Sequence, residues 1–381
     1  MQGKQHLFIP GPTPVPPEVT AAMTRPVVGH RGSEYASLQR SLVEKVKQVF
    51  QTENELFILT SSGTGAMEAA VTSCLNPGDR VLALITGQFG QRFADIAEQC
   101  GTEVKRMEFP WGEPVDIEAV RAVLNKGPLP QAVLVTHNET STGVVNDVAA
   151  LGAMLKDTPT LLLVDAVSSM GAMDIRTDEW AVDFMATSSQ KAFMLPPGLA
   201  FLSVSDKGWQ AVEKVSSRSY YFNLASWRKS GIKGFAPWTP NVSLMFGLQE
   251  ALNLMFAEGL KKMWARHWRQ ARAVRAGLRA MGFELVAADE YASPTVTAAY
   301  VPDDKADALR AVVGRDYGLS LAGGKGKLAG RVIRMSHMGY VDELEILGAL
   351  AILELGLKQL GFKMTLGSGV ARAQMQFIQE A

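Results

Sequence analysis

The sequence predicts an α/β fold in which helices flank a mostly parallel, seven-stranded sheet, with a smaller α+β domain at the carboxyl end. Between about residues 56 and 204, short apolar runs alternate with longer segments of helical period. Polar or glycine-rich turns separate them, and this alternation is typical of a parallel sheet with helical crossovers. After residue 240 the alternation gives way to one long helical stretch and two isolated strand-like runs.

The expected elements of the first part follow one another regularly. Seven apolar runs are predicted as strands, at residues 56–59, 80–85, 103–107, 132–136, 161–164, 184–186 and 199–204. Segments with helical period lie between them, at residues 65–74, 89–99, 117–124 and 148–155. Each strand is followed by a turn, so the carboxyl ends of the parallel strands are expected to share one edge of the sheet.

The second part predicts a separate, smaller domain. One helical stretch over residues 244–281 is expected to bridge the domains. Strands are predicted at 296–300 and 331–336, with helices at 305–313 and 342–357, and the weakly periodic tail after residue 362 is expected to be loosely held. A chain of 381 residues is long for one compact domain. We therefore predict a large domain over 15–255 and a small one made of 256–381 with 1–14.

Composition narrows the classes of partner and location. Lys plus Arg equals Asp plus Glu, 38 each, so no net charge favours nucleic acid or an anionic membrane. No run approaches the length needed to cross a bilayer, and no export signal is recognised before the turn-forming residues 9–14. Cys74 and Cys100 show no disulfide or metal-binding pattern, and the histidines lack metal-ligand spacing. A cytoplasmic protein without a metal, acting on small molecules, is expected.

Two residues carry the predicted chemistry, and each follows a predicted strand. Asp165 follows the apolar run 161–164, where ligands bind in open α/β sheets, although an acid there can also merely cap a helix. Lys191 ends the polar turn after the next strand. A loop lysine is usually a solvated charge, but the apolar residues 192–195 would desolvate this amine and lower its pKa.

A desolvated lysine and a buried acid at one sheet edge suit pyridoxal-phosphate chemistry. The lysine holds the cofactor aldehyde as a Schiff base, and the freed amine later serves as a general base. An anionic Asp165 would keep the pyridine nitrogen protonated. The glycine-containing turn 60–66, between a strand and a helix, offers backbone N–H groups for the phosphate. Such turns also bind nucleotides or simply connect elements, but the dinucleotide and P-loop patterns are absent from it.

Five motifs are specific in combination. They are Ser62-Gly-Thr-Gly-Ala-Met-Glu68, Gly87-Gln-Phe-Gly-Gln-Arg92, His137-Asn-Glu-Thr-Ser-Thr-Gly143, Val164-Asp-Ala-Val-Ser-Ser169 and Ser189-Gln-Lys-Ala192. With them the chain resembles class V aminotransferases of pyridoxal-phosphate fold type I, close to the alanine/serine–glyoxylate group. The resemblance covers nearly the whole chain. It implies ping-pong transfer of an amino group from a small amino acid, such as alanine or serine, to glyoxylate or pyruvate.

The resemblance assigns the cofactor contacts. It implies that Ser62, Gly63 and Thr64 hold the phosphate, with Gln190 beside them. Around the ring it implies four further roles. Phe89 stacks on one face where relatives often have tryptophan, Val167 contacts the other face, Thr140 reaches the phenolic oxygen or the substrate, and Asp165 binds the pyridine nitrogen. Without the resemblance, Phe89 and Val167 would be interpreted as ordinary core residues.

The resemblance also implies a substrate contact and a partner subunit. Arg334 matches the arginine that binds the substrate carboxylate, whereas the residues alone also allow a solvated arginine on an edge strand. Thr239 matches a residue donated across a homodimer interface to the phosphate of the neighbouring subunit. A tyrosine found three positions earlier in a relative is replaced here by Ala236, which leaves one phosphate contact unassigned.

Two alternatives stay open, and one charged stretch is interpreted as structural. A cysteine desulfurase or another lyase would use the same lysine and aspartate, but no cysteine follows Cys100 to act as its nucleophile. A non-catalytic scaffold of this fold is the other alternative. Five arginines recur at helical intervals and are expected to form a solvated face. They are Arg266, Arg269, Arg272, Arg275 and Arg279.

Overall fold

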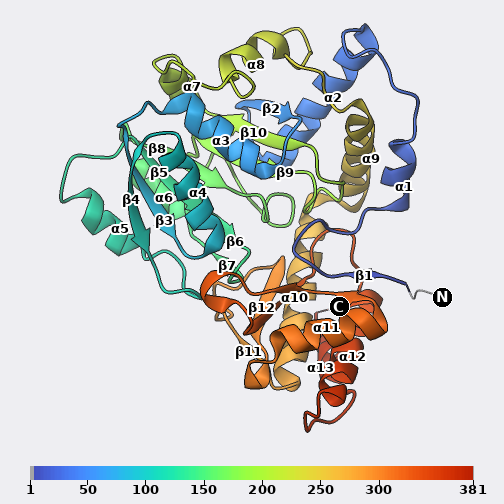
Figure 1. The fold of residues 1–381 in the computed structure, drawn as a ribbon. Helices are drawn as coiled ribbons and strands as arrows, with labels where there is room; N and C mark the ends of the chain where they lie inside the picture. The colour runs from blue at the N-terminus through green and yellow to red at the C-terminus, as the bar shows by residue number, and fades with distance from the viewer. Residues whose placement is uncertain (1–3, 381) are drawn as a thin grey trace.

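The computed structural model describes residues 4–380, and its main feature is a seven-stranded mixed sheet between two layers of helices (Figure 1). The strand order is β2-β10-β9-β8-β5-β3-β4. Only β10 runs antiparallel to its neighbours, so the sheet is mostly parallel, as predicted. Its strands are β2 (Glu55–Leu59), β3 (Arg80–Ile85), β4 (Glu103–Glu108), β5 (Ala132–Thr136), β8 (Leu161–Asp165), β9 (Phe184–Ser188) and β10 (Ala200–Val204).

Alternate residues of each strand enter different hydrophobic cores on the two faces of the sheet. Leu162 and Val164 of β8 join one core, whereas Leu161 and Leu163 join the other. The first core is completed by α1 (Pro17–Ala22), α2 (Ser33–Phe50), α5 (Ile117–Leu124), α6 (Val148–Leu155) and α9 (Val242–Glu258). The second is completed by α3 (Gly63–Cys74), α4 (Gln88–Gln99), α7 (Asp206–Val212) and α8 (Leu224–Gly231). Burial on both faces explains why the central strands are apolar throughout, whereas the edge strand β4 contains charged residues.

The carboxyl-terminal part forms its own sheet and core, below the large sheet in Figure 1. Its antiparallel strand order is β11-β12-β15-β14. The elements are β11 (Glu284–Leu285), β12 (Val296–Tyr300), β14 (Ala322–Gly323), β15 (Val332–Ser336), α11 (Ala306–Tyr317), α12 (Glu343–Gln359) and α13 (Ser368–Gln379). The first strand of the chain, β1 (His6–Leu7), pairs with β13 (Leu319–Ser320), and Phe8 enters this core. Beside the large sheet, β6 (Asn138–Glu139) pairs with β7 (Val144–Val145).

The single helix predicted over residues 244–281 is wrong, because the structure has two helices there. Helix α9 ends at Glu258, and α10 (Leu260–Ala280) begins directly after Gly259. Gly259 has φ 87°, a left-handed conformation that interrupts helical hydrogen bonding and that glycine adopts without a steric penalty. The break reorients the chain from the core of the large sheet to that of the small one.

The loosely held tail predicted after residue 362 is also wrong, because α13 packs against α10. A Cβ atom on Gly369 would lie 2.9 Å from the carbonyl oxygen of Gly277, so the two backbones approach closely. Ala373 and Phe377 are buried in the third core. The expected solvated arginine face is wrong at Arg275, whose side chain is buried and paired with Asp289 at 3.0 Å. In residues 4–380, no helix has the length and apolarity that a membrane span requires.

Candidate active site

The predicted acid and amine lie at the carboxyl edge of neighbouring parallel strands. Asp165 is the last residue of β8, and in the sheet register it lies opposite Thr136 of β5 and Ala186 of β9. Lys191 follows the end of β9 by three residues. Both side chains are buried, with 3% and 8% of their surface exposed. The structure therefore places the two groups at the sheet edge that the strand order predicts.

Lys191 is an amine in an apolar setting. The neighbouring Ala192, Phe193 and Leu195 are fully buried, which contradicts the interpretation of Lys191 as a solvated charge. Burial, together with the Arg334 cation, lowers the pKa of the amine to about 8, and the Asp165 carboxylate opposes this shift. About a tenth of the amine is therefore neutral at pH 7, far more than for an ordinary lysine, and the neutral form is the one that a nucleophile or base requires.

The amino-terminal segment covers the lysine. The Lys191 ammonium donates a hydrogen bond to the carbonyl of Pro10, and the Thr13 hydroxyl donates to the carbonyl of Lys191 at 2.9 Å. Gly11 has φ +128°, and a Cβ atom there would lie 2.7 Å from Lys191 Nζ. Only glycine satisfies both the backbone conformation and this close approach. The turn predicted at residues 9–14 thus lies directly over Lys191.

Asp165 is desolvated and incompletely paired. One carboxylate oxygen accepts a hydrogen bond from the Val167 amide at 2.9 Å, whereas the other is 3.5 Å from the Thr136 hydroxyl. Burial raises the pKa of Asp165 to about 6, against the effect of the Val167 hydrogen bond. The acid thus stabilises the turn that follows β8, and it retains acceptor capacity for a further donor.

The glycine-containing turn lies where β2 leads into α3. Ser62 is the N-cap residue of α3 but makes no side-chain capping bond, and Thr64 lies in the first helical turn. A Cβ atom on Gly63 would lie 2.4 Å from the side chain of Val167, so the turn packs directly against the loop that carries Asp165. Unpaired N–H groups at this helix start favour an anion.

Two buried polar atoms near this turn have no partner among the described residues. They are the Ser188 hydroxyl at the end of β9 and the side-chain oxygen of Gln190. The Ser188 hydroxyl would be 3.1 Å from a Cβ atom on Gly63. Buried polar groups in folded proteins are normally hydrogen-bonded, so these two atoms are available to bind a polar ligand.

Phe89 and Thr140 reach the same region from other elements. Phe89 lies in the first turn of α4, half-buried, with the Arg92 guanidinium 4.9 Å from its ring centre. The Thr140 hydroxyl donates to the Ser168 hydroxyl at 2.8 Å. Sequence analysis did not single out the neighbouring Glu139, whose side chain is completely buried. Its signal was an acid shortly after a buried strand, the same signal that drew attention to Asp165.

Arg334 joins the small sheet to this site. Its Nη1 donates to the carbonyl of Thr140 at 3.0 Å and its Nε to the carbonyl of Gly323 at 2.9 Å. The interpretation as a solvated edge-strand arginine is wrong, because β15 is paired on both sides and Arg334 is 5% exposed. Burial lowers the pKa of Arg334 to about 10, and the Glu139 carboxylate opposes this shift. Within residues 4–380, Arg334 forms no ion pair.

Thr239 lies in an exposed loop that contacts the start of the glycine-containing turn. The amide of Asn241, two residues later, donates to the Thr60 hydroxyl at 3.2 Å. Nearby, Tyr220 is 80% exposed and stacks on Trp238 with ring centres 4.6 Å apart. Ala236 is buried, and its carbonyl accepts a hydrogen bond from Arg31. The role predicted for Thr239 involves a second subunit and stays a prediction.

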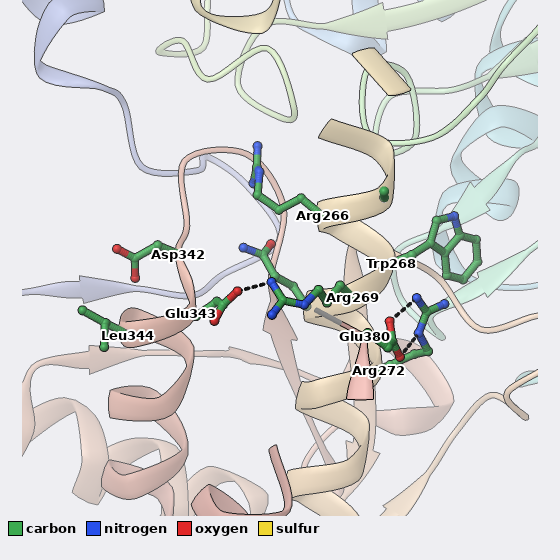
Figure 2. Close-up of a pocket in the computed structure, with 10 residues that line it drawn as sticks. Arg266, Trp268, Arg269, Arg272, Asp342, Glu343, Leu344 and Glu380 are labelled. Atoms are coloured by element: carbon green, nitrogen blue, oxygen red, sulfur yellow. Dashed lines mark hydrogen bonds and ion pairs between the residues drawn. The ribbon is translucent and has the colours of Figure 1, made fainter. Parts of the chain in front are cut away.

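Another cavity lies away from these residues, along α10. It measures about 770 Å³ and is bounded by α10, the start of α12 and the end of α13. Figure 2 shows Arg269 turned to Glu343 and Arg272 turned to Glu380, each in an ion pair. Arg266 pairs with Glu258 at 2.7 Å. In the described part of the chain, no group of three or more His, Cys, Asp or Glu side chains is arranged to hold a metal ion.

The chain matches known proteins over almost its whole length. The family model described as aminotransferase class-V matches residues 6–342. An uncharacterized aminotransferase of Methanocaldococcus jannaschii is 42% identical over 99% of this chain and 98% of its own. The small subunit of a soluble hydrogenase from a Synechococcus strain is 41% identical over 98% of both chains. A serine–glyoxylate aminotransferase of Arabidopsis thaliana is 39% identical over 97% of this chain and 94% of its own.

Solved structures agree with the fold. The pyridoxamine–pyruvate aminotransferase of Mesorhizobium loti superposes with a TM-score of 0.94 at 30% identity, covering 100% of this chain and 98% of that one. The ureidoglycine–glyoxylate aminotransferase of Bacillus subtilis superposes with a TM-score of 0.93 at 28% identity, covering 99% of both. These superpositions confirm the predicted fold class.

Proposed function

The chain belongs to the class V aminotransferases, and we propose that it uses pyridoxal 5′-phosphate to move an amino group from a small amino acid to a small 2-oxo acid. One observation carries the proposal. Lys191, Asp165 and Arg334 are all buried, come from different elements, and form no ion pair with one another or with any other described residue. Buried charges are costly unless they are paired, so their partners are expected to be ligands.

The residues present fit the cofactor. Ser62, Gly63 and Thr64 would hold its phosphate at the start of α3, where the unpaired Ser188 hydroxyl and Gln190 side chain add polar groups. Four other residues would contact the ring. Phe89 and Val167 would contact its faces, Thr140 its phenolic oxygen, and Asp165 its nitrogen. When bound, the cofactor supplies an electron sink for the electron pair that stays on the α-carbon when the substrate's α-proton is removed.

The three buried charged side chains then have distinct roles. Lys191 would hold the cofactor, and its free amine would accept the substrate's α-proton as a general base. Its lowered pKa, about 8, suits both roles near neutral pH. Asp165 in its anionic form keeps the ring nitrogen protonated. Arg334 binds the substrate carboxylate with its planar guanidinium, which Gly323 and Thr140 orient through their carbonyls.

The substrate class is supported by the relatives' names. The Arabidopsis and Bacillus proteins are named for glyoxylate as the acceptor and the Mesorhizobium protein for pyruvate, both small 2-oxo acids. The amino donors in these names differ, as they are serine, ureidoglycine and pyridoxamine. We therefore propose glyoxylate or pyruvate as the acceptor, with alanine or serine as the first donors to test.

We further propose a cytoplasmic homodimer in which each subunit gives Thr239 to its neighbour's phosphate site. The exposed stack of Tyr220 and Trp238 beside this loop supports an interface, since large exposed aromatic side chains often mark protein contacts. Light scattering of the purified protein would test the dimer. Mixing a Thr239→Ala subunit with a Lys191→Ala subunit would test sharing, because only shared sites recover activity in the mixed dimer.

The cofactor and the reaction are tested together. The protein is purified with pyridoxal phosphate, reduced with borohydride and digested, and mass spectrometry is expected to find the cofactor on the peptide containing Lys191. A panel of amino donors is then crossed with glyoxylate, pyruvate and 2-oxoglutarate. Amino transfer with one small donor supports the proposal. A protein that binds no cofactor, or that releases sulfide or ammonia without any amino transfer, would contradict it.

A further inference from the structure

We propose that Glu139 is a positioning residue of the active site, which fixes Phe89 and Thr140 relative to each other by binding the start of α4. The inference rests on the proposed function, because Phe89 and Thr140 matter to catalysis only if they contact the cofactor. Glu139 itself is completely buried and touches neither substrate nor cofactor in this proposal. It would act through the two residues that it holds.

The contacts of Glu139 form a saturated carboxylate site. Oε2 accepts hydrogen bonds from the amides of Phe89 and Gly90, each at 3.0 Å. Oε1 accepts from the amide of Ser141 at 3.0 Å and from its hydroxyl at 2.5 Å. Burial raises the pKa of Glu139, and the hydrogen bonds from Ser141, Gly90 and Phe89 oppose this shift. The four donors and the positive end of the α4 dipole stabilise the carboxylate form, since a protonated carboxyl would need an acceptor for its own hydrogen.

The turn before α4 is fitted around this carboxylate. A Cβ atom on Gly87 would lie 2.5 Å from Cγ of Glu139, so residue 87 must lack a side chain for the two segments to meet. The backbone at Gly87 is extended, and the close approach alone explains the glycine. The Ser141 hydroxyl also accepts a hydrogen bond from the Gln88 amide at 3.0 Å. The position of Phe89 is thus determined by the loop that contains Glu139.

The same loop carries the other groups of the site. Thr140 follows Glu139 directly, and its hydroxyl is held by the Ser168 hydroxyl at 2.8 Å. The carbonyl of Thr140 receives the hydrogen bond of Arg334. The Glu139 carboxylate also favours the charged form of Arg334, whose pKa burial lowers. One buried side chain therefore connects α4, the loop after β5 and the arginine of the small sheet.

The chain contains a second carboxylate of the same kind, away from this site. Glu354 of α12 is 3% exposed and accepts hydrogen bonds from the amides of Gly367 and Gly369, each at 2.6 Å. It holds the start of α13 as Glu139 holds the start of α4. The two residues differ in the helix that they hold. Helix α4 carries Phe89, a proposed cofactor contact, whereas α13 packs into the carboxyl-terminal core.

The experiment compares Glu139→Gln with Glu354→Gln in the full-length protein. Both variants keep the side-chain shape and remove one acceptor, so both are expected to lower the melting temperature of the apoprotein. The dissociation constant for pyridoxal phosphate, measured by absorbance, is expected to rise about tenfold or more in Glu139→Gln. In Glu354→Gln it is expected to stay within about twofold of the wild type. The Glu139→Gln holoprotein is also expected to have a lower kcat than the wild type.

The outcomes separate this inference from the proposed function. If the wild type itself binds no pyridoxal phosphate, the proposed function fails. If the wild type binds it and Glu139→Gln binds it equally well with unchanged kcat, the positioning role is wrong. Should Glu139→Gln not fold, Ser141→Ala removes one donor to Glu139 and the acceptor of the Gln88 amide. It is then expected to weaken cofactor binding about threefold, and unchanged binding would overturn the proposal.

Discussion

Two buried arginines, Arg334 of the small sheet and Arg275 on α10, differ in whether a carboxylate balances their charge. Both residues are buried, with 5% of Arg334 and 4% of Arg275 exposed. Arg275 is paired with Asp289 at 3.0 Å, whereas Arg334 donates only to backbone carbonyls. The cavity along α10 measures about 770 Å³, but its residues Arg266, Arg269 and Arg272 are each paired with a carboxylate of a neighbouring element. Charge balance, and not cavity volume, therefore distinguishes the candidate site from the structural region.

The largest effect is expected for Lys191→Met. Removing this buried amine should lower kcat/KM by about a thousandfold or more, because both the covalent and the base function are lost. The apoprotein should be no less stable at pH 7, since burial already lowers the pKa of this amine to about 8. Kinetics and thermal unfolding of the apoprotein would check this. A large loss of stability would mean that Lys191 is a structural residue.

The two buried arginines can be compared directly by Arg334→Gln and Arg275→Gln. Arg334→Gln should raise KM for the amino donor about 10- to 100-fold, because a charged hydrogen-bond donor to the substrate carboxylate is lost. Arg275→Gln should instead destabilise the protein by about 1 to 3 kcal/mol, since the ion pair of the buried guanidinium with the half-exposed Asp289 and its hydrogen bond to the Ser293 carbonyl are lost. Its KM should stay within about twofold of the wild type. Urea unfolding and steady-state kinetics of both variants measure the contrast, which vanishes if both variants change KM alike.

The pH dependence of stability offers a test of the unpaired acid. The folded pKa of Asp165 is about 6 against an ordinary value of 3.8, so the folded apoprotein holds the proton more tightly than the unfolded chain. The wild type should therefore lose stability relative to Asp165→Asn as the pH rises from about 3 to 7, by roughly 3 kcal/mol. Urea unfolding of both apoproteins across this range checks the sign. A wild type that gains relative stability over the same range would show that Asp165 is well paired.

Sequence reasoning predicted the regular parts of the molecule and the residues attached to them. All seven strands of the large sheet match predicted strands, and α3, α4, α5 and α6 match predicted helices, whereas α1, α2, α7 and α8 were not predicted. The buried strands could be recognised because they are continuously apolar. The positions of Asp165 and Lys191 at the sheet edge were predicted because both residues follow such strands. Glu139 was missed: it follows a buried strand as Asp165 does, but the loop 137–143 contains several polar residues and its sequence does not indicate which side chain turns inward. Helix α13 was missed because its burial depends on Gly277 of α10, a contact between distant parts of the chain.

The smallest effect is expected for Arg272→Gln, which removes the ion pair with Glu380 shown in Figure 2. Arg272 is 44% exposed, and ion pairs at such positions contribute about 0 to 1 kcal/mol to stability. The melting temperature should fall by only a few degrees, about 2 or less, and kcat/KM should stay within about twofold of the wild type. Glu380→Gln should have the same small effect, and the double variant should equal either single one. If Arg272→Gln instead changes KM for either substrate, the cavity along α10 takes part in substrate binding. Ion pairing of the arginines would then not distinguish a structural region from a binding site in this protein.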